Sequence, residues 1–292
     1  MDSNLHTNAA NMVTARPFET DRWKGVVGYD PGFLGVSVPM PLPRDLADVQ
    51  LTTDGDPTLD YTHFSVVMST SRRLAHVAAV NIDGARYVEI VRDSDKWRLD
   101  PRIPVEAQID NDAYVSNDYD RGHLVRRVSP NWGTAAEADQ ANDDTFHYTN
   151  AAPQHKDLNR KTWLDLESYI LNEAIARKIR VSIFTGPVFR PDDTVYRQDF
   201  QIPADYWKVA IAADGSHLAG AAYLQTQRNL IPTVSASPYG DYKTYRVPIS
   251  IVTQLTGLDL APIQTIEPVQ STSAMRQTVR EIADISDIEF LA

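Results

Sequence analysis

The sequence predicts an α+β fold with a central antiparallel sheet and one principal helix. Short apolar runs of strand-like composition lie between residues 63 and 91 and again between residues 179 and 227. One long amphipathic pattern, over residues 157–178, has the spacing of a helix. No internal repeat and no clear linker divides the 292 residues. Hairpin-length turn signals between the runs, together with one long helix, are typical of a single α+β domain.

The strands of the expected sheet are apolar runs bounded by turn residues. The basic segment Ser71-Arg72-Arg73 separates the first two runs, and Asp83-Gly84 predicts a hairpin turn before the third. Ala213-Asp214-Gly215 predicts another turn between the last two. The six runs cover residues 63–69, 76–82, 85–91, 179–189, 206–214 and 217–227.

Helices and loops complete this expectation. The principal helix is expected over residues 157–178 with Asp157 as its N-cap, and a short helix is expected to end at Gly257. Residues 128–143 read as a loop, and residues 144–154 as a strand that ends in a turn. A short terminal helix over residues 276–285 is an open alternative to irregular structure.

The chain is expected to hold one functional domain. Residues 1–20 read as a flexible leader, because they are polar and lack an apolar pattern. The domain itself is expected to span residues 21–262. Its first part, residues 21–60, is rich in proline and glycine and is expected to be irregular. Residues 263–292 are expected to form a C-terminal extension.

Composition excludes several classes of protein. The chain has no cysteine, which rules out disulfides, thiolate nucleophiles and cysteine-based metal sites. A net charge of −11 argues against a protein that coats nucleic acid or membrane, although a locally basic site is compatible with it. The first 20 residues lack the charged head and apolar stretch of a signal peptide. We therefore expect a cytoplasmic location for the chain as written, with export by a non-standard route as the alternative.

The expected helix carries two polar residues beside its apolar stripe. Trp163, Leu166 and Ile170 should face the core, and helical spacing brings Asn159 and Glu167 to the border of the same stripe. Structural roles, a helix cap and an ion pair, would explain both residues. The alternative is a site for a hard cation, because amide and carboxylate oxygens suit Mg²⁺, which keeps most of its waters.

The segment Asp120-Arg121-Gly122-His123 begins a basic cluster in an acidic protein. Residues 121–127 contain three arginines and a histidine and no acidic residue. Guanidinium groups offer a planar fork of donors to phosphate, and an imidazole has a pKa suited to general-base work near neutrality. A solvated basic loop with a satisfied histidine is the structural alternative.

Two linked motifs resemble those of the DNA/RNA non-specific endonuclease family, which includes Serratia-type nucleases and endonuclease G. The first is Asp-Arg-Gly-His at residues 120–123. The second follows at residues 149–167, with its residues in the order and spacing of the family: Thr149, Asn150, Pro153, Gln154, Leu158, Asn159, Trp163, Leu166 and Glu167. The resemblance covers about residues 60–260. It implies a ββα-metal (His-Me finger) nuclease fold.

The resemblance also implies catalytic roles. His123 matches the general base, and Asn159 matches the one protein ligand of Mg²⁺, for which Mn²⁺ is an alternative. Glu167 matches the residue that holds metal-bound water, and Arg121 the arginine that contacts the phosphate. Asn150 matches a position that lines or supports the site. The implied reaction is hydrolysis of phosphodiester bonds in DNA and RNA, which leaves 5′-phosphate products.

Substrate contacts are expected from further polar residues around these two motifs, namely Arg126, Arg127, Gln154 and Arg160. An upstream arginine assists some relatives, and the sequence leaves that role open between Arg92 and Arg98. A catalytically silent module that binds nucleic acid or phosphate is the alternative function. Control of a non-specific nuclease leaves three options open: an inhibitor protein, conditional activation or export. A homodimer is a further open expectation, and no membrane partner is expected.

Overall fold

The computed structural model describes residues 21–92, 95–160, 162–197, 200–214, 217–230, 244–264, 266, 279–282 and 288. The expected leader, residues 1–20, and most of the expected extension, residues 263–292, lie outside the described residues. Within the described residues, no helix is long and apolar enough to cross a membrane.

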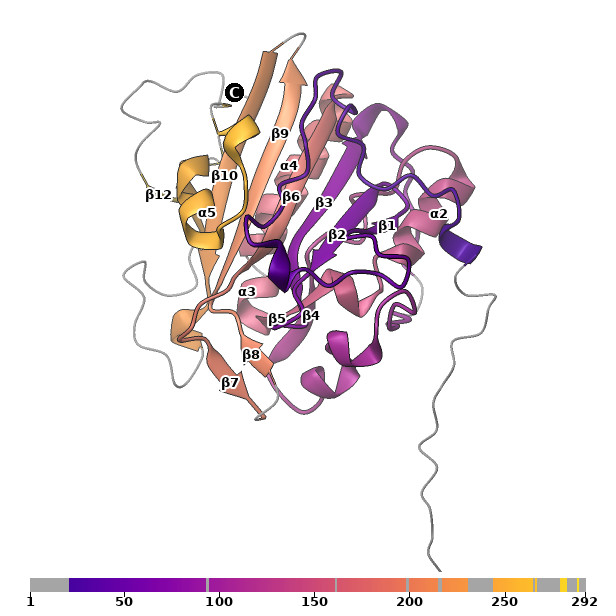
Figure 1. The fold of residues 1–292 in the computed structure, drawn as a ribbon. Coiled ribbons are helices and arrows are strands. Elements are labelled where there is room, and N and C mark those ends of the chain that lie inside the picture. The colour runs from indigo at the N-terminus through magenta and orange to yellow at the C-terminus, as the bar shows by residue number, and fades with distance from the viewer. Residues whose placement is uncertain are drawn as a thin grey trace, which may run out of the picture.

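The expected central antiparallel sheet is confirmed (Figure 1). In the described part of the chain it has eight strands, and every neighbouring pair is antiparallel. In spatial order these are β1 (Leu59–Tyr61), β2 (Phe64–Met68), β3 (Ala75–Asp83), β6 (Arg180–Val188), β9 (Asp205–Asp214), β10 (His217–Thr226), β11 (Thr244–Val247) and β12 (Arg280–Ile282). Two small hairpins stand apart from this sheet: β4 (Tyr119–His123) with β5 (Ala151–His155), and β7 (Thr194–Tyr196) with β8 (Phe200–Ile202).

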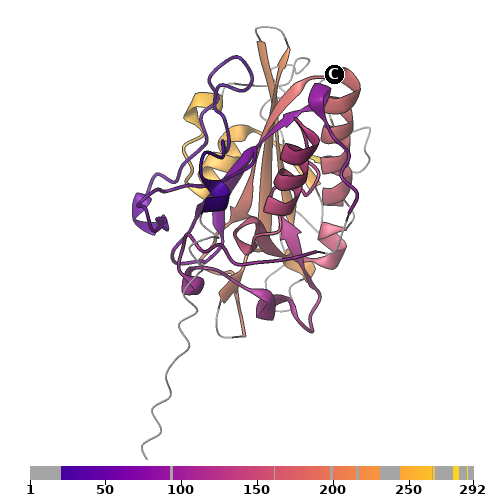
Figure 2. The same cartoon turned by 90° about the vertical axis from the view of Figure 1, so that its right-hand side faces the viewer.

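Both faces of the sheet are covered (Figure 2). Helices α2 (Ala135–Asp144) and α4 (Thr162–Arg177) lie on one side of it. The N-terminal segment and α5 (Ile249–Thr256) lie on the other. Successive side chains of β2 point to opposite faces of the sheet, so the strand contributes to both cores. Phe64 and Val66 pack in the core beneath α4, and Val67 packs in the core on the other face.

The expected hairpin at Asp83-Gly84 is wrong. Strand β3 ends at Asp83, a 3-10 helix follows over Gly84–Arg86, and β3 pairs with β6 instead of with residues 85–91. Gly84 allows the backbone at the end of β3 to lie close to the backbone of α4. A Cβ at Gly84 would lie 1.9 Å from the carbonyl oxygen of Ala174 in α4, so only glycine lets the end of β3 pass beneath the helix.

The expected loop over residues 128–143 is also wrong in its second half, which forms α2. The helix begins after Thr134, whose side chain accepts a hydrogen bond from the Glu137 backbone N–H at 3.2 Å. The Glu137 carboxylate accepts one from the Thr134 N–H at 2.7 Å. This reciprocal capping box was present in the sequence as Thr-x-x-Glu, and it outweighs the many polar residues that follow.

The principal helix is divided in two. Residues Lys156–Asn159 form the short α3, and α4 begins at Thr162. The side chain of His155 caps α3 by accepting from the Asp157 N–H at 3.2 Å, so the expected cap at Asp157 is wrong. The short α5 is confirmed, with Gly257 in the left-handed conformation at its end. The alternative helix at 276–285 is wrong at residues 280–282, which pair with the edge of the sheet as β12.

Candidate active site

The β4–β5 hairpin presents the first motif. Arg121 and His123 are two residues apart on β4, so their side chains leave the same face of the hairpin. Gly122 lies between them and pairs with Ala152 of β5. The fully buried side chain of Gln154 occupies the space beside Gly122, where a Cβ would lie 2.2 Å from Gln154 Oε1. The absence of a side chain at Gly122 therefore leaves room for the buried Gln154 side chain to pack against β4.

Asn150 holds the chain just after the histidine. Its Oδ1 accepts from the Val125 N–H at 2.8 Å, and its Nδ2 donates to the Val125 and Thr145 carbonyls at 2.9 and 3.1 Å. The side chain is fully buried. These bonds lock the segment that leaves β4, so Asn150 supports the position of His123 through the backbone.

One cavity of about 560 Å³ gathers most of the predicted site residues. The structure does not bring Asn150 and Gln154 to it: both are fully buried and neither belongs to its lining. The residues that line it come from the segment before β4, from β4 and the turn after it, and from α3 and α4. They are Arg92, Asp95, Trp97, Asp120, Arg121, His123, Arg126, Arg127, Val128, Asn159, Arg160, Leu164 and Glu167.

Asn159 is oriented by a carboxylate. It is the last residue of α3, and its Nδ2 donates to Asp120 Oδ2 at 3.0 Å. An ionised carboxylate only accepts hydrogen bonds, so the contact fixes which end of the amide is nitrogen and leaves Oδ1 for another partner. Arg160 holds the same carboxylate with two hydrogen bonds, of 2.8 and 2.6 Å.

Glu167 faces the cavity from α4 and is held by a buried lysine. Lys208 of β9 is 2% exposed, and its Nζ lies 3.3 Å from Glu167 Oε1. The same ammonium donates to Thr185 Oγ1 at 2.7 Å and lies 4.7 Å from the ring centroid of Trp163. Glu167 Oε1 is buried and has no hydrogen-bond partner. Its ion pair with Lys208 holds the Glu167 carboxylate at the wall of the cavity.

His123 lies in an aromatic enclosure. Its ring centroid is 4.7 Å from that of Trp97 and 5.2 Å from that of Phe146, and its Nε2 is buried without a hydrogen-bond partner. Burial is the main cause that lowers the pKa of His123 to about 3; the nearby charges of Arg92, Arg127 and Arg126 act in the same direction, and the charge of Asp95 opposes them. The ring is therefore neutral near pH 7, the form that can accept a proton.

The structure distinguishes the two upstream arginines. Arg92 lines the cavity and forms two hydrogen bonds to Asp95, of 3.0 and 2.6 Å. Arg98 instead donates to the Asp143 carbonyl at 2.7 Å and pairs with the Asp143 carboxylate at 2.7 Å. Arg92 is accordingly the upstream arginine that the cavity can use, and Arg98 is a structural residue.

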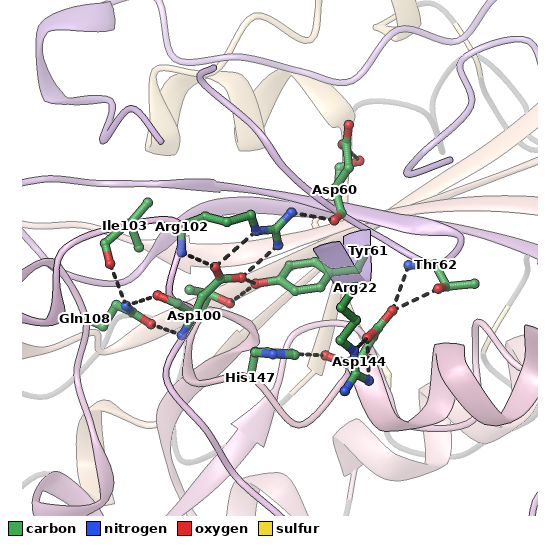
Figure 3. A network of polar contacts seen from close by, with 12 residues as sticks. Arg22, Asp60, Tyr61, Thr62, Asp100, Arg102, Ile103, Gln108, Asp144 and His147 are labelled. Atoms are coloured by element: carbon green, nitrogen blue, oxygen red, sulfur yellow. Dashed lines mark hydrogen bonds and ion pairs between the residues drawn. The ribbon is translucent and has the colours of Figure 1, made fainter. Parts of the chain in front are cut away.

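A buried polar network joins Tyr61 to Asp100, three residues after Trp97, and Thr62 to Asp144, two residues before Phe146; Figure 3 shows these contacts. Asp100 accepts from the Tyr61 hydroxyl and from Arg102, and Asp144 accepts from Thr62 and Arg22. The side chain of Asp144 is fully buried, so this carboxylate is a structural part of the network. The 98–100 segment lies beside residues 146–148 through the Arg98 and Tyr148 backbone N–H groups.

The cavity fits a hydrated hard cation better than a cation held by many side chains. In the described part of the chain no group of three or more histidine, aspartate or glutamate residues could hold a metal ion. The available donors are the Asn159 amide oxygen and the Glu167 carboxylate, whose Oε1 is ion-paired with Lys208. Mg²⁺ takes one or two protein oxygens and keeps its remaining waters, so this donor set suits it.

Sequence reasoning missed three residues of this site. Asp120 was part of the first motif but received no role, although it orients Asn159. Trp97 lies next to basic residues and gave no periodic signal. Lys208 was visible as a single charge inside the apolar run of β9, and such a residue needs a buried partner.

The hairpin, the following helix and the polar cavity between them define a ββα-metal nuclease fold. A solved chain of EndoG, in its complex with EndoGI, matches this structure with a TM-score of 0.53 at 19% identity, covering 76% of this chain and 92% of that chain. The family model for DNA/RNA non-specific endonucleases matches residues 42–263. The chain belongs to this family.

Curated relatives agree with this assignment. The protein y4fB of Sinorhizobium fredii is 34% identical over 303 residues, which cover 96% of this chain and 44% of that protein. Human mitochondrial endonuclease G is 26% identical, covering 57% of this chain and 56% of the relative. A nuclease of Nostoc is 27% identical, covering 61% and 63%. The chain thus spans about half the length of the curated relatives it matches.

Proposed function

We propose that this protein is a metal-dependent endonuclease that hydrolyses phosphodiester bonds of DNA and RNA and leaves 5′-phosphate products. The single observation that carries the proposal is the cavity itself. It combines a neutral, enclosed His123 with the oxygens of Asn159 and Glu167, and arginines surround all three. These are a base, a cation site and an anion site within one space.

The base in this proposal is His123. A neutral imidazole can take a proton from water, and the resulting hydroxide attacks phosphorus in line with the 3′ oxygen. The tight packing of Trp97 and Phe146 fixes the plane of the ring, and the bonds of Asn150 to Val125 fix the backbone behind it. Orientation of this kind reduces the entropy that would be lost on reaching the transition state.

Asn159 and Glu167 would hold the cation, Asn159 through its amide oxygen and Glu167 through bound water. A divalent ion such as Mg²⁺ or Mn²⁺ supplies charge neutralisation for the phosphate and the leaving oxygen. The hydrogen bond from Asn159 to Asp120 turns the amide oxygen of Asn159 away from the Asp120 carboxylate, and the ion pair with Lys208 holds Glu167 in place.

The arginines bind the substrate in this proposal. Arg121 holds the scissile phosphate, and Arg126, Arg127 and Arg160 contribute to the basic wall. Contacts to phosphate carry no information on base identity, so we expect weak sequence preference. Attack by external water needs no ribose 2′-hydroxyl, so DNA and RNA are both substrates.

Cleavage of plasmid DNA and of RNA, with and without EDTA, tests the proposal. Wild-type protein should cut both in Mg²⁺ and neither in EDTA. The His123→Ala variant should lose about 10²–10⁴-fold in turnover. Retention of more than about a tenth of the rate would refute the base assignment. The alternative, a silent module that binds nucleic acid or phosphate, predicts binding that EDTA does not affect and no cleavage.

An inhibitor protein is our proposal for control of the activity. The EndoG chain that matches this fold was solved in complex with EndoGI, in a structure that concerns the mechanism of EndoG inhibition. A partner that places carboxylates among the cavity arginines would exclude phosphate by the same charges that attract it. The homodimer, the location and a non-standard export route stay predictions.

A further inference from the structure

Five arginines line the cavity, and in the described part of the chain three of them, Arg121, Arg126 and Arg127, lack a carboxylate at ion-pair distance. Arg92 and Arg160 are paired with Asp95 and Asp120. In the described part of the chain, neither Arg126 nor Arg127 has a carboxylate at ion-pair distance.

The hydrogen bonding of this pair is also incomplete. Arg126 Nη1 is buried and has no hydrogen-bond partner, and Arg127 Nη1 makes one long bond, of 3.3 Å, to the Ile90 carbonyl. Burying an unpaired guanidinium costs free energy, so this arrangement calls for an anion from outside the chain.

The two groups also repel each other and their surroundings. Burial lowers the pKa of Arg127, and the charges of Arg92 and Arg126 lower it further, against the opposite effects of Tyr87 and Asp95. A protein with a net charge of −11 keeps three guanidinium groups close enough to destabilise one another. An anionic ligand between them would relieve that repulsion.

A second hollow, of about 190 Å³, continues from the cavity at this point. It shares Arg92 and Arg127 with the cavity and extends past Lys96 toward Gln140 and Phe146. Its two acidic lining residues differ: Asp143 is neutralised by Arg22 and Arg98, and Asp139 lies exposed on α2. None of His123, Asn159 or Glu167 lines this hollow, so it is a passage that leads away from the reacting groups.

We propose that Arg126 and Arg127 form a second phosphate subsite, which binds the phosphate next to the scissile one in a polynucleotide strand. The strand then leaves the cavity through the hollow toward α2. This inference rests on the proposed function, because it takes the first phosphate to lie at Arg121 and His123. The substrate class is a chain with at least two consecutive phosphodiesters, and a dinucleoside monophosphate fills the reactive position alone.

The test compares kcat/KM for a dinucleoside monophosphate and for a longer oligonucleotide of the same bases. In the double variant Arg126→Gln/Arg127→Gln, the preference for the oligonucleotide should fall by about tenfold or more. The salt dependence of oligonucleotide binding, measured in EDTA, should become less steep by about one phosphate contact for each arginine removed. The double variant Lys24→Gln/Arg44→Gln removes two exposed charges from the N-terminal segment, outside both hollows, and is the matched control.

Two further measurements keep the result interpretable. Circular dichroism during heating should show that Arg126→Gln/Arg127→Gln is at least as stable as wild type, because the substitution removes repelling charges. The charge-preserving variant Arg126→Lys/Arg127→Lys should retain most of the preference for the oligonucleotide.

Three results would overturn the subsite. Equal losses on both substrates would place the arginines at the scissile phosphate. No loss on either would make them surface charges. Failure of wild-type protein to cleave either substrate would overturn the proposed function, and the subsite with it.

Discussion

The side-chain amide of Asn159 donates a 3.0 Å hydrogen bond to the carboxylate of Asp120. The contact joins the end of α3 to β4, and both elements contribute side chains to the lining of the cavity. Because a carboxylate accepts only from the amide nitrogen, Asp120 determines that the oxygen of Asn159 is the atom offered to a cation.

The first prediction concerns this orientation. Asp120→Asn should weaken Mn²⁺ binding about ten- to a hundredfold, the usual cost of removing a group that orients a metal ligand. The variant lets the Asn159 amide rotate, since an asparagine side chain both donates and accepts. Titration of Mn²⁺ by electron paramagnetic resonance measures the affinity. Asp118→Asn is the control, because Asp118 is exposed and pairs with Lys156 away from the cavity. Equal effects in both variants would contradict the prediction.

Lys208 and Glu167 should show strong energetic coupling. Lys208→Met leaves a buried carboxylate without its cation, and we expect a loss of about 3 kcal/mol in the free energy of unfolding. Glu167→Gln in the same background should restore most of that loss, because the stranded charge is gone. Urea denaturation of the two single variants and the double variant measures the coupling. Strictly additive effects would mean that the 3.3 Å contact contributes nothing.

Asn150 should be a positioning residue and not a chemical one. Asn150→Ala leaves the backbone N–H and carbonyl of Val125 and the Thr145 carbonyl without their buried partner, so we expect a loss of about 2–3 kcal/mol in stability. Mn²⁺ affinity of the folded fraction should stay close to wild type. A variant with unchanged stability and abolished turnover would instead give Asn150 a direct part in the reaction.

His123 should make the metal-free protein sensitive to acid. Its pKa in the folded protein, about 3, lies below the unfolded value of about 6.5, so the unfolded chain binds a proton in this window that the folded chain does not. Stability must therefore fall as the pH falls. Between about pH 7 and pH 5 the loss from this residue is about 2 kcal/mol. In EDTA, His123→Asn should show a correspondingly shallower decline in urea denaturation, and an identical decline would refute the lowered pKa.

The sheet and α5 could be predicted because their signals are local. Apolar runs ended by turn residues predict strands, and Gly257 predicts the end of α5. The prediction of a hairpin at Asp83-Gly84 failed because a local turn signal carries no information about distant contacts. Gly84 is needed because the backbone of Ala174, which is far away in the sequence, lies too close for a side chain. The division into α3 and α4 could not be predicted, because the apolar pattern runs through both helices without interruption.

The residues of the site were likewise predictable only in part. Those in the two motifs could be found because their order and spacing along the sequence match those of the endonuclease family. Asp120 and Lys208 gained their roles only from contacts across 39 and 41 residues, to Asn159 and Glu167, and no pattern within one element encodes such contacts. Gln154 was expected to touch substrate, and it lies instead against Gly122, because alternation along β5 directs it into the protein.

The most direct test of the account is anomalous diffraction from a crystal soaked in Mn²⁺. We predict one strong peak in the cavity, about 2.1 Å from the amide oxygen of Asn159, with Glu167 reaching the ion through water and His123 facing it across a space the size of one phosphate. A peak bound elsewhere, or none beside Asn159 at saturating Mn²⁺, would contradict the account.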